Sequence, residues 1–230
     1  MTVPGTAIIT GASQGLGLAL ARALADRHWR LVIDARTRGD LERAADQLGA
    51  TTEVHALAGD VTDEWHREAL LAAAGDHVDL LVNNASHLGP SPQPGLDSYP
   101  LRELERVLEV NLLAPLALIQ LALPRMAGGC LINVTSDAAV EAYEGWGGYG
   151  ASKAALDQLT AILAAEHPEL RIYAVDPGDM RTRMHQEAFP EEDISDRPPP
   201  EESVPGLLEL IDGDLPSGRY RARELAGVGV

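Results

Sequence analysis

Several residue types and features are scarce in this sequence of 230 residues. Cys130 is the only cysteine, so an internal disulfide is excluded and a reducing, cytoplasmic location is expected. The longest apolar segment, 112–123, is interrupted by Pro115 and Gln120 and is too short for a membrane-spanning helix. The N-terminus lacks the basic region and cleavage site of a signal peptide. No membrane partner is therefore expected.

Positive charge is also scarce. Lys and Arg number 18 against 35 Asp and Glu, which gives a formal net charge of −17 at pH 7. Such a charge repels the phosphate backbone of nucleic acids and anionic lipid surfaces, so neither is an expected partner. No metal site is predicted. The content of 45% hydrophobic and 23% charged residues is typical of a globular chain, and the length fits one domain over residues 1–230.

Short apolar runs alternate with longer segments of helical spacing. The runs are rich in β-branched residues and bounded by turn residues, as expected of buried strands, whereas the longer segments repeat apolar residues every three to four positions. Strands are predicted at Ala7–Ile9, Leu31–Ile33, Val78–Val82, Leu131–Val134 and Ile172–Val175, with another ending at Asp60-Val61, and helices at Leu16–Arg27, Leu41–Leu48, Glu64–Ala73, Leu101–Leu123 and Ala151–Glu166. This alternation predicts an α/β fold with a doubly wound parallel sheet.

The composition changes after residue 176. Residues 176–214 contain twelve acidic residues and three arginines, with three prolines at 198–200. A solvated surface loop is one interpretation. A mobile flap over a site, at about 179–200, is the other, because long loops in compact domains are often functional. A short helix is predicted at Ser203–Ile211 and a last edge strand at Gly218–Glu224.

A glycine-rich segment follows the first predicted strand and opens the first predicted helix. Its sequence, residues 10–17, has the spacing G-x-x-x-G-x-G. Glycines there let backbone N–H groups approach a pyrophosphate at the helix N-terminus, although glycines also mark tight turns. The position between strand and helix favours the phosphate site. The candidate cofactor-binding residues are Gly11, Ser13, Gln14, Gly15, Leu16 and Gly17.

Polar residues also end the third and fourth predicted strands. Asp60-Val61 ends the third strand, and Asn83-Asn84-Ala85-Ser86 ends the fourth. Ligands of open α/β sheets bind at the carboxyl ends of the strands. We therefore expect Asp60, Val61, Asn83 and Ala85 to contact a cofactor, and turn formation is the alternative explanation for the asparagines.

Lys153 is the only lysine beside 17 arginines, which indicates a role that a guanidinium cannot fill. Tyr149 lies four residues earlier, so the two side chains share one face of a helix. A cation there stabilises a tyrosinate, and we expect it to lower the phenol pKa from ~10 toward the working pH of a general acid or base. Chance spacing of a surface lysine and a core tyrosine is the alternative explanation.

Together these motifs resemble the short-chain dehydrogenase/reductase family. The match covers about residues 5–185 and comprises Gly11–Gly17, Asn83–Ala85, Asn111, Ser136, Tyr149-x-x-x-Lys153 and Pro177-Gly178 through Thr182. The resemblance implies a single Rossmann-like dinucleotide-binding domain of about seven parallel strands. It also implies hydride transfer between a nicotinamide cofactor and a small carbonyl or alcohol substrate.

The resemblance further implies roles for single residues. Tyr149 would be the acid/base, and Ser136 would orient the substrate oxygen. Lys153 would also hold the nicotinamide ribose, and Asn111 would interrupt its helix to hold a relay water. The remaining cofactor contacts implied by the family are Pro177, Gly178 and Thr182, the last of these at the carboxamide.

The sequence departs from the family pattern in two places. Ser86 stands where a glycine usually follows Asn-Asn-Ala, and the tail from Ser217 lacks the usual glycine pair, which leaves little chain for a deep substrate pocket. A dinucleotide-binding regulatory or signalling protein of the same fold, with incidental activity, is the alternative function. The complete Asn, Ser, Tyr and Lys set favours the enzyme.

Two competing positions bear on the choice of cofactor. Asp34 lies 23 residues after Gly11, near the offset at which an acid binds the ribose hydroxyls of NAD. In the resembled family the discriminating acid aligns with Ala35, and NADP-preferring members carry an arginine at the next position, which is Arg36. We favour NADP, with Arg36 on the 2′-phosphate. NAD is the alternative if the second strand is shifted in register, so that Asp34 contacts the ribose.

Two predicted helices bear on assembly. Residues 112–123 and 151–166 carry more apolar side chains than one face of a sheet needs. Members of the resembled family commonly pair through these two helices, so a symmetric homo-oligomer, dimer or tetramer, is expected.

Overall fold

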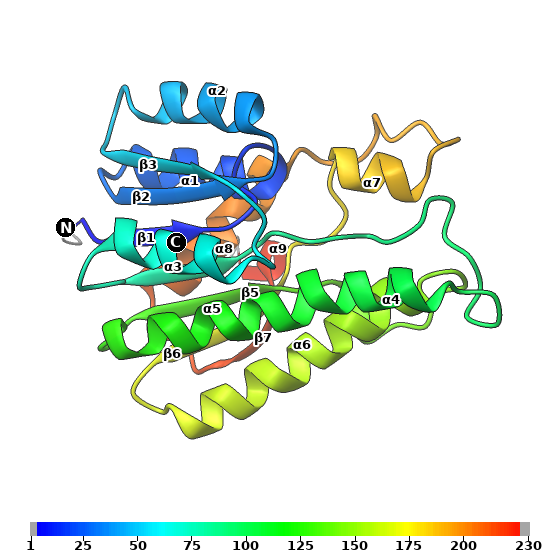
Figure 1. Cartoon of the computed structure of the whole chain (residues 1–230). Helices are drawn as coiled ribbons and strands as arrows, with labels where there is room; N and C mark the ends of the chain where they lie inside the picture. Colours follow the sequence, from blue (N-terminus) through cyan, green and yellow to red (C-terminus); the bar gives the residue numbers. More distant parts are fainter. Residues whose placement is uncertain (1–3, 226–230) are drawn as a thin grey trace.

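The computed structural model describes residues 4–225 and contains one seven-stranded sheet (Figure 1). All paired strands are parallel, in the order β3-β2-β1-β4-β5-β6-β7. The strands are β1 Thr6–Ile9, β2 Arg30–Ala35, β3 Val54–Ala58, β4 Leu80–Asn83, β5 Cys130–Val134, β6 Arg171–Asp176 and β7 Gly218–Arg221. The predicted α/β fold is confirmed. The strand order reverses between β1 and β4, which opens a crevice at their carboxyl ends.

Helices cover both faces of the sheet. One face carries α1 Gly15–Ala25, α2 Arg38–Leu48 and α8 Val204–Asp212, and the other carries α3 Glu64–Ala74, α5 Ala114–Ala122 and α6 Gly147–Glu166. Successive strand residues point to opposite faces, so Ile9 packs in the first core and Ile8 in the second. Burial on both faces explains why these strands are nearly continuous apolar runs.

The helix predicted over residues 101–123 is interrupted. It consists of α4 Leu101–Leu108, a π-helical turn η1 Glu109–Leu113, α5, and a 3₁₀ turn η2 Leu123–Arg125. Pro115 lies in the first turn of α5, directly after the π-helical turn, and it has no N–H to donate to the preceding helical turn. By length and apolar content alone, residues 101–125 could cross a membrane, but in this structure they pack against α3, α6 and the sheet. The π-helical turn places Asn111 in the protein interior.

Two strands were predicted to continue three residues beyond their observed ends. β3 ends at Ala58, so Asp60 and Val61 lie in the following loop. β7 ends at Arg221 rather than Glu224, because a one-turn helix, α9 Ala222–Leu225, begins there. The buried Ala222 packs closely on Gly206 of α8, and this long-range contact replaces the strand expected from local sequence.

The acidic segment contains a helix that was not predicted. α7 Arg183–Ala188 begins after Thr182, whose Oγ1 accepts the His185 N–H at 3.2 Å. In Figure 1 α7 lies beyond the sheet, on the side where α4 begins. Ser91 Oγ donates to the Glu187 carbonyl at 2.6 Å, which joins α7 to the loop after β4. Mobility of the flap over residues 179–200 stays a prediction.

Candidate active site

The loop between β1 and α1 is a candidate anion site. Gly11 and Gly15 have φ values of +67° and +58°, a region that favours glycine. A Cβ on Gly11 would lie 2.9 Å from Cα of Ala85, so this loop and the loop that follows β4 approach too closely for a side chain. No side chain caps the start of α1 at Gln14. The first N–H groups of α1 are therefore available to a phosphate.

A cleft of about 680 Å³ opens at the carboxyl ends of the strands. It is bounded by loops that follow β1, β2, β3, β4 and β6, which the parallel topology brings to one edge. Its lining includes most of the predicted cofactor residues, namely Gly11, Ser13, Gln14, Gly15, Leu16, Arg36, Asp60, Val61, Ala85, Tyr149, Lys153, Pro177 and Thr182. The cleft, the open helix start and the exposed Arg36 together fit a phosphorylated dinucleotide.

Other predicted residues lie outside this cleft. Asn83 is buried, and its Nδ2 donates to Oδ1 of Asn133 at 2.8 Å, so its amide holds β4 to β5 instead of facing a cofactor. Gly17 is a packing glycine, because a Cβ there would lie 2.6 Å from Nδ2 of Asn84. Gly178 lines a neighbouring cavity.

Asn84, in contrast, was not among the predicted site residues. Its Nδ2 donates to the carbonyl oxygens of Thr10 and Gly11 at 2.8 and 3.1 Å, and the residue lines the cleft. The adjacent asparagines of the motif could not by themselves show which amide faces the loop.

The Asp34 carboxylate is fully engaged below the glycine-rich loop. Oδ1 accepts the Gly11 N–H at 2.7 Å, and Oδ2 lies 2.9 Å from Nε2 of His66. Both side chains are buried. Asp34 therefore shapes the phosphate loop, and the side chain of Arg36 is left exposed at the rim of the cleft. His66, which lies 32 residues away on α3, was missed by the sequence analysis.

Asp60 forms an ion pair with Arg106, a partner that the sequence analysis missed. Arg106 of α4 donates to Oδ2 of Asp60 at 2.5 Å and to Thr62 Oγ1 at 3.0 Å. Burial raises the pKa of Asp60, but the hydrogen bonds from Thr62 and Arg106 outweigh it and the net shift is downward. Asp60 is an ionised anchor that fixes the loop after β3.

Tyr149 and Lys153 lie together on α6. Both are buried, and Lys153 Nζ is 5.5 Å from the Tyr149 ring centroid and donates to the Val134 carbonyl at 2.8 Å. Burial lowers the pKa of Lys153 to about 8 and raises the pKa of Tyr149 to about 12. The expected lowering of the tyrosine pKa is not found in this structure, because burial outweighs the opposing hydrogen bond with Ser86.

A smaller cavity of about 100 Å³ adjoins the cleft and contains Ser136 and Gly178 in its lining. Tyr149 lines both spaces. Ser136 Oγ donates to Oδ1 of Asp137 at 2.9 Å and accepts the Ala138 N–H at 3.2 Å, so the serine also caps a short 3₁₀ turn, η3 Asp137–Ala139. The hydroxyl must leave Asp137 to donate to a ligand in the cavity.

Asn111 is completely buried and connects the loop after β4 to α6. Its Oδ1 accepts from His87 N at 2.7 Å and from Ser86 Oγ at 3.1 Å, while its Nδ2 donates to His87 O and Ser152 Oγ, both at 2.9 Å. Ser152 Oγ in turn donates to the Tyr149 carbonyl at 2.6 Å. The Asn111 side chain thus supports the turn that carries Tyr149.

Comparison with known proteins identifies the family of this chain. The family model described as short chain dehydrogenase matches residues 5–193. A benzil reductase ((S)-benzoin forming) of Saccharomyces cerevisiae is 31% identical over 244 residues, which cover 96% of this chain and 90% of the relative. Sepiapterin reductase of Mus musculus is 33% identical over 197 residues, covering 78% and 76%. A short chain dehydrogenase structure from Shigella flexneri, complexed with NADP, has a TM-score of 0.86 at 25% identity and covers 95% and 96%.

The fold, the site and these similarities define a class of protein. The chain belongs to the short-chain dehydrogenase/reductase family. It is an NAD(P)-dependent oxidoreductase with a Rossmann-like fold.

Proposed function

We propose that this protein reduces a small carbonyl compound with NADPH, and that Tyr149 donates the proton. The observation that carries this proposal is the place of Tyr149, which lines both the large cleft and the small cavity. A proton donor at that junction lies between a cofactor in the cleft and a substrate in the cavity. A protein that only binds a dinucleotide would need Lys153 but would not need Tyr149 and Ser136 together.

The described residues support a reductive proton transfer. Bound NADPH supplies the hydride. Tyr149 keeps its proton at neutral pH, since burial raises its pKa to about 12, and a neutral phenol donates to the developing alkoxide. Ser136 Oγ provides a second donor to the same oxygen after it leaves Asp137. Lys153 Nζ donates to the Val134 carbonyl, and its remaining N–H groups would hold the nicotinamide ribose.

Two observations favour NADPH over NADH. Both oxygens of Asp34 are occupied by Gly11 and His66, so this carboxylate is not free to bind ribose hydroxyls. Arg36 lines the cleft with an exposed side chain, and it takes part in none of the ion pairs found among residues 4–225. A guanidinium in that position suits a 2′-phosphate. The related structure from Shigella flexneri described above is complexed with NADP.

The small cavity favours a neutral or cationic substrate. Leu88, Trp146 and Met184 supply apolar walls, and Asp137 and Asp179 supply negative charge. Neither lysine nor arginine lines this cavity in the described part of the chain. An anionic substrate would be repelled there. The names of the two relatives above, both reductases, support the reductive direction.

The first experiment compares the parent with Tyr149→Phe, using a panel of aldehydes, ketones and quinones and NADPH. Removing a positioned acid should lower kcat by about 10²–10⁴-fold, because only the phenolic proton is lost. NADPH binding, followed by its fluorescence, should stay near the parent value. Tyr220→Phe is the control, since Tyr220 lies on β7 and its hydroxyl bonds to Pro216. Turnover of Tyr149→Phe at the rate of the control would show that Tyr149 is not the acid.

A further inference from the structure

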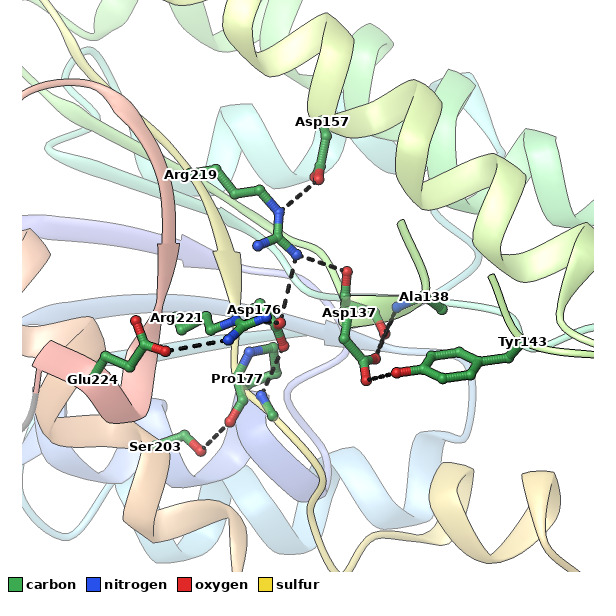
Figure 2. Close-up of polar contacts among 12 residues, drawn as sticks. Asp137, Ala138, Tyr143, Asp157, Asp176, Pro177, Ser203, Arg219, Arg221 and Glu224 are labelled. Carbon is green, nitrogen blue, oxygen red and sulfur yellow. Dashed lines mark hydrogen bonds and ion pairs between the residues drawn. The ribbon is translucent and has the colours of Figure 1, made fainter. Parts of the chain in front are cut away.

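Arg219 connects three parts of the active site from the last strand of the sheet (Figure 2). Its Nε donates to Oδ2 of Asp157 at 2.9 Å, and its Nη2 donates to the carbonyl oxygen of Ser136 at 3.0 Å. The same Nη2 lies 3.5 Å from Oδ2 of Asp176. One guanidinium therefore joins α6 to the chain that follows β5 and to the end of β6.

Each of these anchors adjoins a residue of the proposed site. Asp157 lies one helical turn beyond Lys153 on α6. Ser136 is itself the proposed second donor to the substrate oxygen. Asp176 accepts the Gly178 N–H on its Oδ1 at 2.9 Å and so shapes the turn that lines the substrate cavity. Arg219 lines neither cavity and touches these residues from behind.

The cluster is largely shielded from solvent. The side chains of Asp176, Asp157 and Arg219 are 5%, 15% and 27% exposed. Burial raises the pKa of the Asp176 carboxyl, whereas the Gly178 N–H and the charge of Arg219 act in the opposite direction. Carboxylates in such a place need a cation that also satisfies their hydrogen bonds.

The strand register and the side chain explain why an arginine stands here. Arg219 pairs with Ala174 and Tyr220 with Val175, and the Tyr220 ring packs on Tyr173 in the core on the α8 side. Alternation along β7 therefore turns Arg219 to the α6 side. A guanidinium presents its N–H groups in a fixed fork that reaches Asp157 and Ser136 together, which a single ammonium cannot reproduce.

We propose that Arg219 is a positioning residue for the reduction, which fixes the main chain of Ser136 relative to the turn of α6 that bears Lys153. This inference rests on the proposed function. Loss of Arg219 should act on kcat, because a displacement of about 1 Å at a catalytic donor can cost ~10²-fold. Cofactor affinity should change little, because the phosphate loop between β1 and α1 is held by Asp34 and Asn84 instead.

The experiment uses Arg219→Ala and Arg219→Lys in the full chain, with Arg221→Ala as the matched control. Arg221 is on the same strand, and its Nε lies 3.9 Å from Oδ2 of Asp176. It also pairs with Glu224, but among the described residues it forms no hydrogen bond or ion pair with Ser136 or Asp157. We expect kcat of Arg219→Ala to fall by about 10–100-fold and that of Arg219→Lys to fall by a smaller factor, with the NADPH Kd within about threefold of the parent. Ethylguanidinium added to Arg219→Ala should restore part of kcat, whereas ethylammonium should not.

The controls separate this inference from the proposed function. Ethylguanidinium should leave the kcat of Arg221→Ala and of Tyr149→Phe unchanged. A general effect of the additive on folding or chemistry would instead change the kcat of these variants as well. If the parent reduces carbonyls and the Arg219 variants have the same kcat as Arg221→Ala, only the positioning role is overturned. A joint loss of kcat and NADPH binding without rescue would also overturn it, since that result indicates a purely structural arginine. If the parent itself catalyses no NADPH-dependent reduction, the proposed function fails and this role fails with it.

Discussion

Lys153 carries its charge in the protein interior. The residue is 2% exposed and donates to the Val134 carbonyl at 2.8 Å. Burial lowers its pKa from the ordinary 10.5 to about 8, although the charge of Asp157 opposes the shift. A buried ammonium costs folding free energy, so stability does not explain its presence, whereas the role proposed for Lys153 beside Tyr149 and the cofactor ribose does.

This burial predicts a specific dependence of stability on pH. Between about pH 8 and pH 10.5 the unfolded chain binds more protons at Lys153 than the folded chain, so the free energy of unfolding rises with pH in that window. Lys153→Met lacks this contribution. We expect the parent to gain about 2 kcal/mol relative to Lys153→Met between about pH 7.5 and pH 10, measured by urea unfolding of both proteins. Parallel pH profiles would contradict the burial of a titrating ammonium.

Arg36 is the residue that we propose selects NADPH over NADH. The parent should show a higher kcat/KM with NADPH than with NADH on the same substrate. Arg36→Ala should lower the NADPH value by about 10–100-fold, the size expected for a lost charge-assisted contact, and leave the NADH value nearly unchanged. Arg27→Ala serves as a remote control, because Arg27 pairs with Asp212 at 2.5 Å. An unchanged preference in Arg36→Ala would show that another residue recognises the phosphate.

At the scale of elements, the strands and long helices follow from local pattern, but several short elements do not. Apolar runs such as β1 and β5 are buried on both faces, so their composition alone indicates strands. α9 has four residues and depends on the contact of Ala222 with Gly206, far away in the sequence. The interruption at η1 was expected only through the family resemblance, since residues 101–123 have continuous helical spacing.

α7 is a short helix with no buried residue, which bears on the predicted flap. Glu187 of α7 accepts a hydrogen bond from Ser91, and Met184 and Ala188 pack against a small cluster that contains Tyr149. Such elements open locally at low free energy. We expect backbone amides of residues 179–200 to exchange rapidly in the free protein and to become protected when NADPH and a substrate bind.

Hydrogen exchange followed by mass spectrometry tests this element directly. Peptides from β1 and β5 provide the internal reference, because both strands are buried and should be protected in every state. Equal protection of residues 179–200 with and without ligands would remove the flap and leave a solvated acidic loop.

At the scale of the whole molecule, the topology explains why the sequence predicted which segments form the site better than which side chains face it. The parallel sheet forces the loops after β1, β4 and β6 to one edge, so motifs at strand ends had to meet. The partners of individual side chains depend on contacts across the fold. His66 binds Asp34 from α3, and Arg219 reaches Ser136 across 83 positions of sequence. No local pattern contains such pairs.

The last prediction, a homo-oligomer, concerns exposed apolar side chains on the outer surface. Leu113, Leu121 and Ile162 are 55%, 36% and 48% exposed on η1, α5 and α6. Burial of this face against a second copy would remove apolar surface from water, but each copy carries a charge of −17 and repels the other. Added salt screens that repulsion, so association should strengthen as ionic strength rises.

Light scattering at micromolar concentration should therefore give a dimer or a tetramer, with the larger share of oligomer at higher salt. Ile162→Glu should shift the population to particles of 24.5 kDa, because it places a carboxylate in the apolar face. Trp65→Glu is the matched control, since Trp65 is 79% exposed on α3 and lies outside the proposed face. A parent that scatters as a 24.5 kDa particle at every salt concentration would refute the oligomer, whereas dissociation by both variants would place the interface elsewhere.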